Sequence, residues 1–155
     1  MPQEQVQIKE LTPLSLLYHA DNRQIVGRTR LQKLSFLVQK DLEEEGGDTL
    51  KFIAYDYGPF SKPLIEAVEK LQEMGLLERE EKRSFSGSKK YIYNLTKKGK
   101  KSYEHNLESG PHAEVLNKLD IASSSVIKNH NNKSLNGLIE FVYEEYPDTA
   151  ENSVY

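Results

Sequence analysis

Apolar residues recur at helical spacing in several stretches of the chain, and the clearest stripe lies between residues 31 and 42. A stripe with this period predicts a helix with one buried face. Its members are Leu31, Leu34, Leu37, Val38 and Leu42. Thr29, with Gln32 three residues later, predicts a capping box at the start of this helix. Similar patterns predict further helices that begin at Thr12-Pro13, Ser61, Thr96, His112 and Ser134.

Two other segments have the composition of strands. Strand-forming residues flank Ser86-Gly87-Ser88, and the second flank alternates through Tyr91, Tyr93 and Leu95. Because small residues between two such segments let the chain reverse, we expect a β-hairpin here. The aromatic and β-branched segment 50–57 predicts a separate short strand, which Gly58-Pro59-Phe60 ends.

The order of helix, hairpin and helix predicts a winged helix-turn-helix fold, α+β and mostly helical, with the hairpin as the wing. Two amphipathic helices after it exceed what this fold needs, so they either pack back on the domain or form a dimer interface. We therefore expect a flexible N-terminus at 1–10, a winged-helix domain at 11–108, a helical extension at 112–147 and a tail at 148–155.

Composition narrows the class of protein. The 155 residues include no cysteine, which excludes disulfides and thiolate metal sites. The chain contains no run of about 18 apolar residues, which a membrane-spanning helix would need. Since the N-terminus also lacks a basic region followed by an apolar one, we expect a cytoplasmic protein with no membrane partner.

The net charge is −3, yet residues 82–101 contain eight basic residues and no acidic one. A local positive patch attracts polyanions even on an acidic protein, because screening removes the effect of distant charges. The alternative is a lysine-rich surface that only contacts water. The candidate phosphate contacts in this segment are Lys82, Arg83, Lys89, Lys90, Lys97 and Lys98. Further candidates are Lys62, Arg28, Arg30 and Lys33, although a solvated helix face is the better explanation of the last three.

The helix that starts at Ser61 would be the recognition helix of a winged helix. Its outward residues include Glu66, Glu69 and Glu73, which phosphates and the electronegative major groove repel. The wing is therefore the better electrostatic candidate for DNA. The same acidic face supports a second hypothesis, a protein-interaction module that binds a basic partner.

Motifs for catalysis or cofactors are not found. The four histidines lie in different predicted elements without metal-ligand spacing. Gly46-Gly47 lacks the Lys-Ser/Thr of a phosphate-binding loop, and no Gly-x-Ser-x-Gly occurs. We expect a protein that is not an enzyme and needs no metal or cofactor.

Three strings resemble a known group of proteins: Gly27–Leu34 (GRTRLQKL), Tyr55–Ser61 (YDYGPFS), and Val142–Asp148 followed by Asn152-Ser153. They are similar to the YwgA-like uncharacterised prokaryotic proteins and, more distantly, to the Panacea (SocA-like antitoxin) domain. Both groups share the LQK helix and the later Y-G-P turn. Residues at this turn either keep the fold or form a pocket around Tyr55 and Tyr57.

A fourth string, Tyr93-x-Leu95-Thr96-x-x-Gly99, resembles the end of the wing in MarR- and PadR-like regulators. Together the resemblances imply a transcriptional regulator or an antitoxin-like factor. We expect it to be a homodimer that binds double-stranded DNA.

Overall fold

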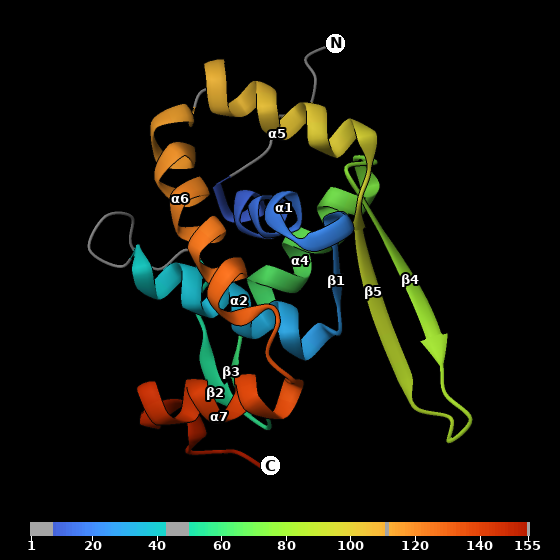
Figure 1. Ribbon diagram of the computed structural model, residues 1–155, viewed down its shortest axis with the longest axis vertical. Helices are drawn as coiled ribbons and strands as arrows, with labels where there is room; N and C mark the ends of the chain where they lie inside the picture. Colours follow the sequence, from blue (N-terminus) through green and yellow to red (C-terminus); the bar gives the residue numbers. More distant parts are fainter. Residues whose placement is uncertain (1–7, 43–49, 111, 155) are drawn as a thin grey trace.

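Helix α2 (Arg28–Asp41) lies at the centre of the fold and contacts α1, α6, α7 and β3. The computed structural model describes residues 8–42, 50–110 and 112–154 (Figure 1). Because other elements surround α2, every residue from 31 to 38 is buried, which is more than the one stripe predicted from its periodicity. The chain is α+β and mostly helical, with a small antiparallel sheet.

Most helices form where their apolar patterns predict them. The helices are α1 (Ile8–His19), α2, α4 (Lys62–Glu73), α5 (Lys97–Ser109), α6 (Ala113–His130) and α7 (Leu135–Glu145), with 3-10 turns at Asp21–Arg23 and Pro147–Ala150. Ser61, Thr96 and Ser134 cap α4, α5 and α7 as predicted. Each side-chain oxygen accepts a hydrogen bond from a backbone N–H in the first turn, which those N–H groups otherwise lack.

Two predicted helix starts were wrong. Helix α1 begins at Ile8, so Pro13 lies inside it and buried Glu10 belongs to the helix. The predicted flexible segment 1–10 is therefore helical at its end, and residues 1–7 lie outside the described residues. Helix α2 begins at Arg28 after Gly27 rather than at a Thr29 capping box, because the Gln32 side chain is bound elsewhere.

The predicted hairpin is present and forms most of a three-stranded sheet. Strands β4 (Leu77–Arg83) and β5 (Lys89–Leu95) are antiparallel, and β5 also pairs with β1 (Gln24–Val26). The order is β1-β5-β4. The sequence predicted no strand at β1, since three residues have too little pattern of their own. In Figure 1 the β4–β5 hairpin extends away from the helical part of the molecule.

A second, two-stranded sheet replaces the predicted single strand at 50–57. Strand β2 (Ile53–Tyr55) pairs with β3 (Gly58–Phe60), and the two-residue turn Asp56-Tyr57 joins them. Gly58 has φ of +100°, a value that L side chains rarely adopt. The Gly-Pro-Phe segment was predicted to end the strand, but it reverses the chain and forms the return strand.

The C-terminal helices pack within the chain. Helix α6 contacts α1 and α2, and α7 contacts α2 and β3. A buried polar chain adds to this packing: the Asp120 carboxylate of α6 accepts a hydrogen bond from Tyr103 (2.6 Å), whose hydroxyl lies 2.7 Å from Ser15 Oγ of α1. The sequence left two roles open for these helices, packing on the domain or forming a dimer interface. Their buried faces pack on the domain. Within the described ranges, no helix is long and apolar enough to cross a membrane.

Candidate functional site

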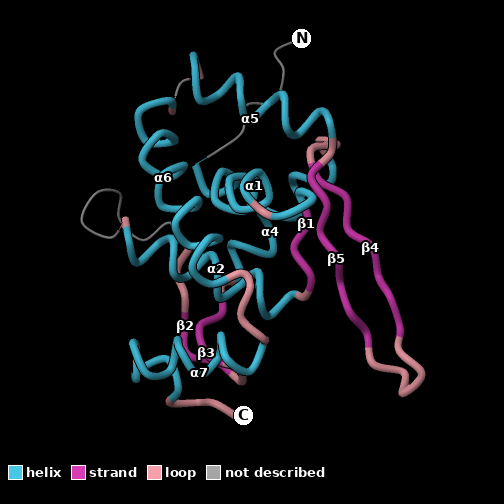
Figure 2. The backbone as a smooth tube through the Cα atoms, in the orientation of Figure 1, coloured by secondary structure: helices cyan, strands magenta, loops and turns pink. Residues whose placement is uncertain are grey.

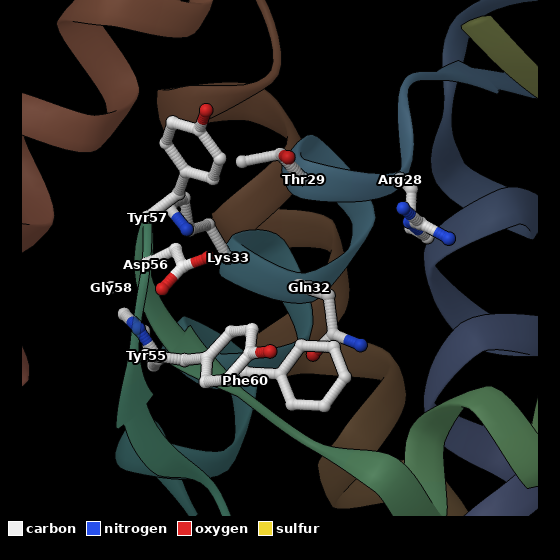
Figure 3. Close-up of a pocket in the computed structure, with 10 residues that line it drawn as sticks. Arg28, Thr29, Gln32, Lys33, Tyr55, Asp56, Tyr57, Gly58 and Phe60 are labelled. Carbon is white, nitrogen blue, oxygen red and sulfur yellow. The ribbon is translucent and has the colours of Figure 1, made fainter. Parts of the chain in front are cut away.

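A pocket of about 320 Å³ lies where the first two sequence strings meet (Figure 3). One wall comes from the N-terminal half of α2 and the other from the β2–β3 hairpin. Its lining residues are Arg28, Thr29, Gln32, Lys33, Tyr55, Asp56, Tyr57, Gly58, Pro59 and Phe60. Segments that are over twenty residues apart in the sequence thus form one site.

The third string holds the hairpin from the other side. Asn152 Nδ2 donates to the carbonyl oxygen of Ala54 (3.2 Å), and the Val154 N–H donates to that of Asp56 (2.8 Å). Tyr143 of α7 donates to Ser153 Oγ at 2.6 Å. Figure 2 shows the C-terminal segment returning beneath α7 beside these strands. All three strings of the YwgA-like resemblance therefore converge at this site.

Gln32 fixes the distance between the two walls. Its Oε1 accepts from the Ser61 N–H (2.8 Å) and its Nε2 donates to the Ser61 carbonyl oxygen (3.1 Å). The Ser61 hydroxyl donates to the Leu50 carbonyl and accepts from the Leu64 N–H. Both polar atoms of the Gln32 amide are therefore used within the protein. Gln32 lines the pocket but does not offer it an unpaired donor or acceptor.

Lys33 is the unusual residue of the site. The sequence suggested a solvated or phosphate-contacting side chain, but Lys33 is only 2% exposed. Its side chain runs from α2 toward the Asp56–Gly58 turn (Figure 3). Burial lowers the pKa of the Lys33 ammonium from 10.5 to about 8. No residue in 8–42, 50–110 or 112–154 forms a hydrogen bond or ion pair with it.

Aromatic rings surround the opening. Tyr55 and Tyr57 are about half exposed, and the Tyr55 ring lies 5.0 Å from the Phe60 ring. Asp56, between the two tyrosines, adds a carboxylate to the lining. The predicted pocket around Tyr55 and Tyr57 is therefore present as a cavity, with one buried cation and one anion in its walls.

Arg28 connects this site with the hairpin β4–β5. Its guanidinium lies over the Tyr91 ring of β5 at 5.4 Å, and Arg79 of β4 lies over the same ring at 4.7 Å. The Gly27 N–H donates to the Tyr91 carbonyl oxygen at 2.7 Å. The start of α2 is thus attached to strand β5 of the hairpin.

The end of that hairpin carries four of the predicted phosphate contacts. Lys82 stands directly opposite Lys90, and Arg83 stands opposite Lys89. Every residue from 78 to 90 is exposed. On one face Glu81 is 3.5 Å from Lys89 and 3.9 Å from Arg83, whereas the pair Lys82 and Lys90 lies on the other face. Phe85, in the turn between the strands, is fully exposed.

The remaining predicted contacts are spread over the molecule. Lys98 donates to the Met74 carbonyl at the end of α4 (2.8 Å), and Arg30 donates to the Asn131 carbonyl (3.2 Å). Burial lowers the pKa of Arg30. Lys62 and Lys97 are exposed first residues of α4 and α5. The structure brings Arg28, Lys33, Tyr55 and Tyr57 together, and it gathers Lys82, Arg83, Lys89 and Lys90 separately.

The fourth string has a structural role. Thr96 Oγ1 accepts from the Gly99 N–H (2.9 Å) and donates to the Gly75 carbonyl (2.7 Å). A Cβ at Gly99 would collide with the Leu76 carbonyl oxygen. The Y-x-L-T-x-x-G string therefore fixes the base of the hairpin against the end of α4.

Sequence reasoning missed Asp56, Gln32 and Phe85 as site residues. Only Phe85 had a local signal, a large apolar residue beside the Ser-Gly-Ser turn. Among the described residues, no three His, Asp or Glu side chains are grouped so that they could hold a metal ion.

No protein-family model matches the chain. The chain is 30% identical to uncharacterized protein YwgA of Bacillus subtilis (strain 168) over 104 residues, which cover 63% of this chain and 56% of YwgA. It thus spans little more than half the length of that relative. This similarity supports the predicted likeness to YwgA-like proteins.

Proposed function

We propose that this chain, a relative of YwgA, is a winged-helix protein that binds double-stranded DNA through the tip of its β4–β5 hairpin. Its role would be that of a transcriptional regulator or antitoxin-like factor. The proposal is carried by the charges at the tip of this projecting hairpin. Two basic residues of β4 stand directly opposite two of β5, Lys82 opposite Lys90 and Arg83 opposite Lys89.

The order of elements supports the fold in this proposal. Helix α1, strand β1, helix α2, helix α4 and the β4–β5 hairpin follow one another as in a winged helix, with the β2–β3 hairpin inserted before α4. The sheet order β1-β5-β4 places the short strand beside the second strand of the wing. In this arrangement the hairpin is free to lie along a duplex.

The charges at the tip favour a polyanion. Like charges directly opposite each other in an antiparallel pair destabilise the pairing. Glu81 offsets this repulsion on the face of Arg83 and Lys89, and no ion pair among the described residues offsets it for Lys82 and Lys90. Two phosphates would neutralise these lysines, and counterion release from DNA would then favour binding.

Phe85 adds an apolar contact at the same tip. A fully exposed aromatic ring between four cations is unfavourable in water but suits a nucleic acid. Aromatic side chains stack on bases, and apolar wedges enter the minor groove. We therefore place the wing at the phosphate backbone and the minor groove.

A salt series tests this proposal. Fluorescence anisotropy on random duplex DNA should give a linear fall of log K with log salt for the wild type. Lys82→Gln/Lys90→Gln should flatten the slope by about 2 units, because each phosphate contact contributes about 0.9. The control Lys118→Gln/Lys128→Gln makes the same charge change on α6 and should leave the slope unchanged. No wild-type binding at about 50 mM salt, where nonspecific contacts are strong, would refute the proposal.

The second candidate function is docking of a basic protein partner on α4. Glu66, Glu69 and Glu73 are exposed along one edge of this helix, whose two cations are exposed Lys62 and half-buried Lys70. Glu69→Lys/Glu73→Lys separates the two functions: it removes a partner that binds this edge, whereas duplex binding by the wing becomes stronger.

The proposal includes a homodimer. Val115 and Ile121 of α6 are exposed apolar residues, and their apolar surfaces support contact between two copies. Sedimentation velocity of the wild type and Ile121→Asp measures this directly: the wild type should sediment as a dimer and the variant as a monomer.

A further inference from the structure

We propose that the pocket between α2 and the β2–β3 hairpin binds a small organic acid, whose carboxylate pairs with Lys33 and whose hydroxyl or amino group donates to Asp56. This site is separate from the basic wing, and the inference does not depend on DNA binding.

The buried Lys33 ammonium is the first step. A lysine that is 2% exposed loses nearly all its contact with water, and buried charges are normally paired. Within the described residues Lys33 has no hydrogen-bond or ion-pair partner, and it lines a cavity of about 320 Å³. An anion that enters this cavity supplies the missing charge.

The size and charges of the cavity indicate the class of ligand. Small-molecule sites commonly measure about 300–1,000 Å³, so this one takes a compact molecule rather than a dinucleotide or a polymer. The Asp56 carboxylate also lines the cavity, and its charge is opposite to that of Lys33. Within the described ranges the two side chains form no ion pair. A ligand with one carboxylate and one hydrogen-bond donor matches both groups, as a hydroxy acid or an amino acid does.

The walls of the pocket leave room for both the polar end and the apolar part of such a ligand. A Cβ on Gly58 would lie 2.9 Å from the Tyr143 ring and 3.4 Å from Lys33 Nζ, so the absence of a side chain keeps the ammonium accessible. The rings of Tyr55 and Phe60 lie together at the opening. They can cover the apolar part of the ligand while its polar end reaches Lys33.

A matched set of four probes tests the ligand chemistry. Phenyllactate and phenylalanine carry both a carboxylate and a donor, phenylpropionate carries only the carboxylate, and phenyllactamide carries only the donor. Binding to the full chain is measured by isothermal titration calorimetry. We expect phenyllactate or phenylalanine to bind with a Kd below about 1 mM, and phenylpropionate and phenyllactamide to bind at least ~10-fold more weakly, since each lacks one hydrogen bond to a charged group.

Three variants test the residues. Lys33→Met keeps the unbranched shape of the side chain, one atom shorter and without the charge, and it should weaken phenyllactate binding more than ~10-fold while the protein remains folded. Asp56→Asn should remove the preference for phenyllactate over phenylpropionate. Lys128→Met, an exposed substitution on α6, is the control and should change neither.

An NMR titration of the Lys33 Cε resonance gives a readout that folding alone does not move. A bound carboxylate stabilises the ammonium, so its titration midpoint should rise from about 8 when phenyllactate is added. The inference is overturned if neither phenyllactate nor phenylalanine binds at about 10 mM, well above the expected Kd, if Lys33→Met binds as the wild type does, or if phenyllactamide equals phenyllactate. Lys33 would then be a core residue whose charge has no ligand.

Discussion

The Gln32 side chain and the Ser61 backbone form two reciprocal hydrogen bonds, at 2.8 and 3.1 Å, in the buried region between α2 and α4. One amide group thereby satisfies both the N–H and the carbonyl of a residue 29 positions away. Gln32 belongs to the LQK string and Ser61 to the Y-G-P string, so this contact joins the two strings directly.

Gln32→Ala should destabilise the protein by about 2–4 kcal/mol, because it leaves two buried backbone groups without partners. Urea unfolding measures the change. Gln24→Ala is the matched control: it removes a single side-chain hydrogen bond to Asn94 at the sheet edge, and it should cost well under half as much. Equal costs for the two variants would contradict this account.

Gly58→Ala should destabilise the protein more than Gly87→Ala does. Both glycines have positive φ, +100° and +83°, so both substitutions strain the backbone. Only at Gly58 does a new Cβ also meet the Tyr143 ring, at 2.9 Å, whereas nothing lies within 4 Å at Gly87. The difference between the two measured free energies of unfolding isolates this contact, which we expect to cost about 1–2 kcal/mol. A difference near zero would mean that Tyr143 moves aside freely.

Lys33 should make stability depend on pH in the alkaline range. Its folded pKa of about 8 lies below the unfolded value of 10.5, so the unfolded chain binds more protons between these values. Stability therefore rises with pH across that window, by about 3 kcal/mol from this group. The other ionisable groups around the site are Tyr55, Asp56 and Tyr57 on the hairpin, Tyr143 on α7 and Arg28 on α2.

Lys33→Met isolates this effect, since the other ionisable groups remain in both proteins. At pH 7 the variant should be more stable than the wild type, because it removes a buried charge without a protein partner. The stability difference should shrink as the pH is raised to about 10. Thermal unfolding at several pH values in a ligand-free buffer measures both trends, and a difference that is constant with pH would contradict the assignment.

Lys90→Glu should separate stability from DNA binding. The introduced carboxylate would face Lys82 across the hairpin, so an unfavourable pair becomes a favourable one and Tm should rise on the order of 1 °C. The same change places a negative charge where we propose a phosphate, so duplex affinity should fall. Calorimetry and anisotropy on one preparation check both. A variant that is less stable and binds less would only show a damaged hairpin.

The local patterns predicted the elements well. Helices α4, α5, α6 and α7 and the β4–β5 hairpin follow from periodicity, caps and turn residues that lie within each segment. Strand β1 was missed because its three residues become a strand only through pairing with β5. The β2–β3 turn was misread because Gly58 was assigned to a break rather than to a reversal.

Lys33 shows why the site was harder to predict than the fold. Periodicity assigns Lys33 to the outer side of a helix with one apolar stripe, and lysine usually contacts water. Three helices and three strands pack around α2, however, so its outer side is buried as well. Arg28, Lys33, Tyr55 and Tyr57 were all candidates in the sequence, but for different reasons. Their meeting in one cavity depends on tertiary packing, which no single stretch contains.

The attachment of residues 152 and 154 to the β2–β3 hairpin has a consequence for the order of folding. Ala54 and Asn152 are 98 positions apart, so this contact closes a very long loop and forms late compared with the local β4–β5 hairpin. During synthesis on the ribosome, the β4–β5 hairpin can therefore form before residues 152–154 are available to hold the pocket wall. Occupation of the pocket would therefore report that the chain has been made and folded through residue 154.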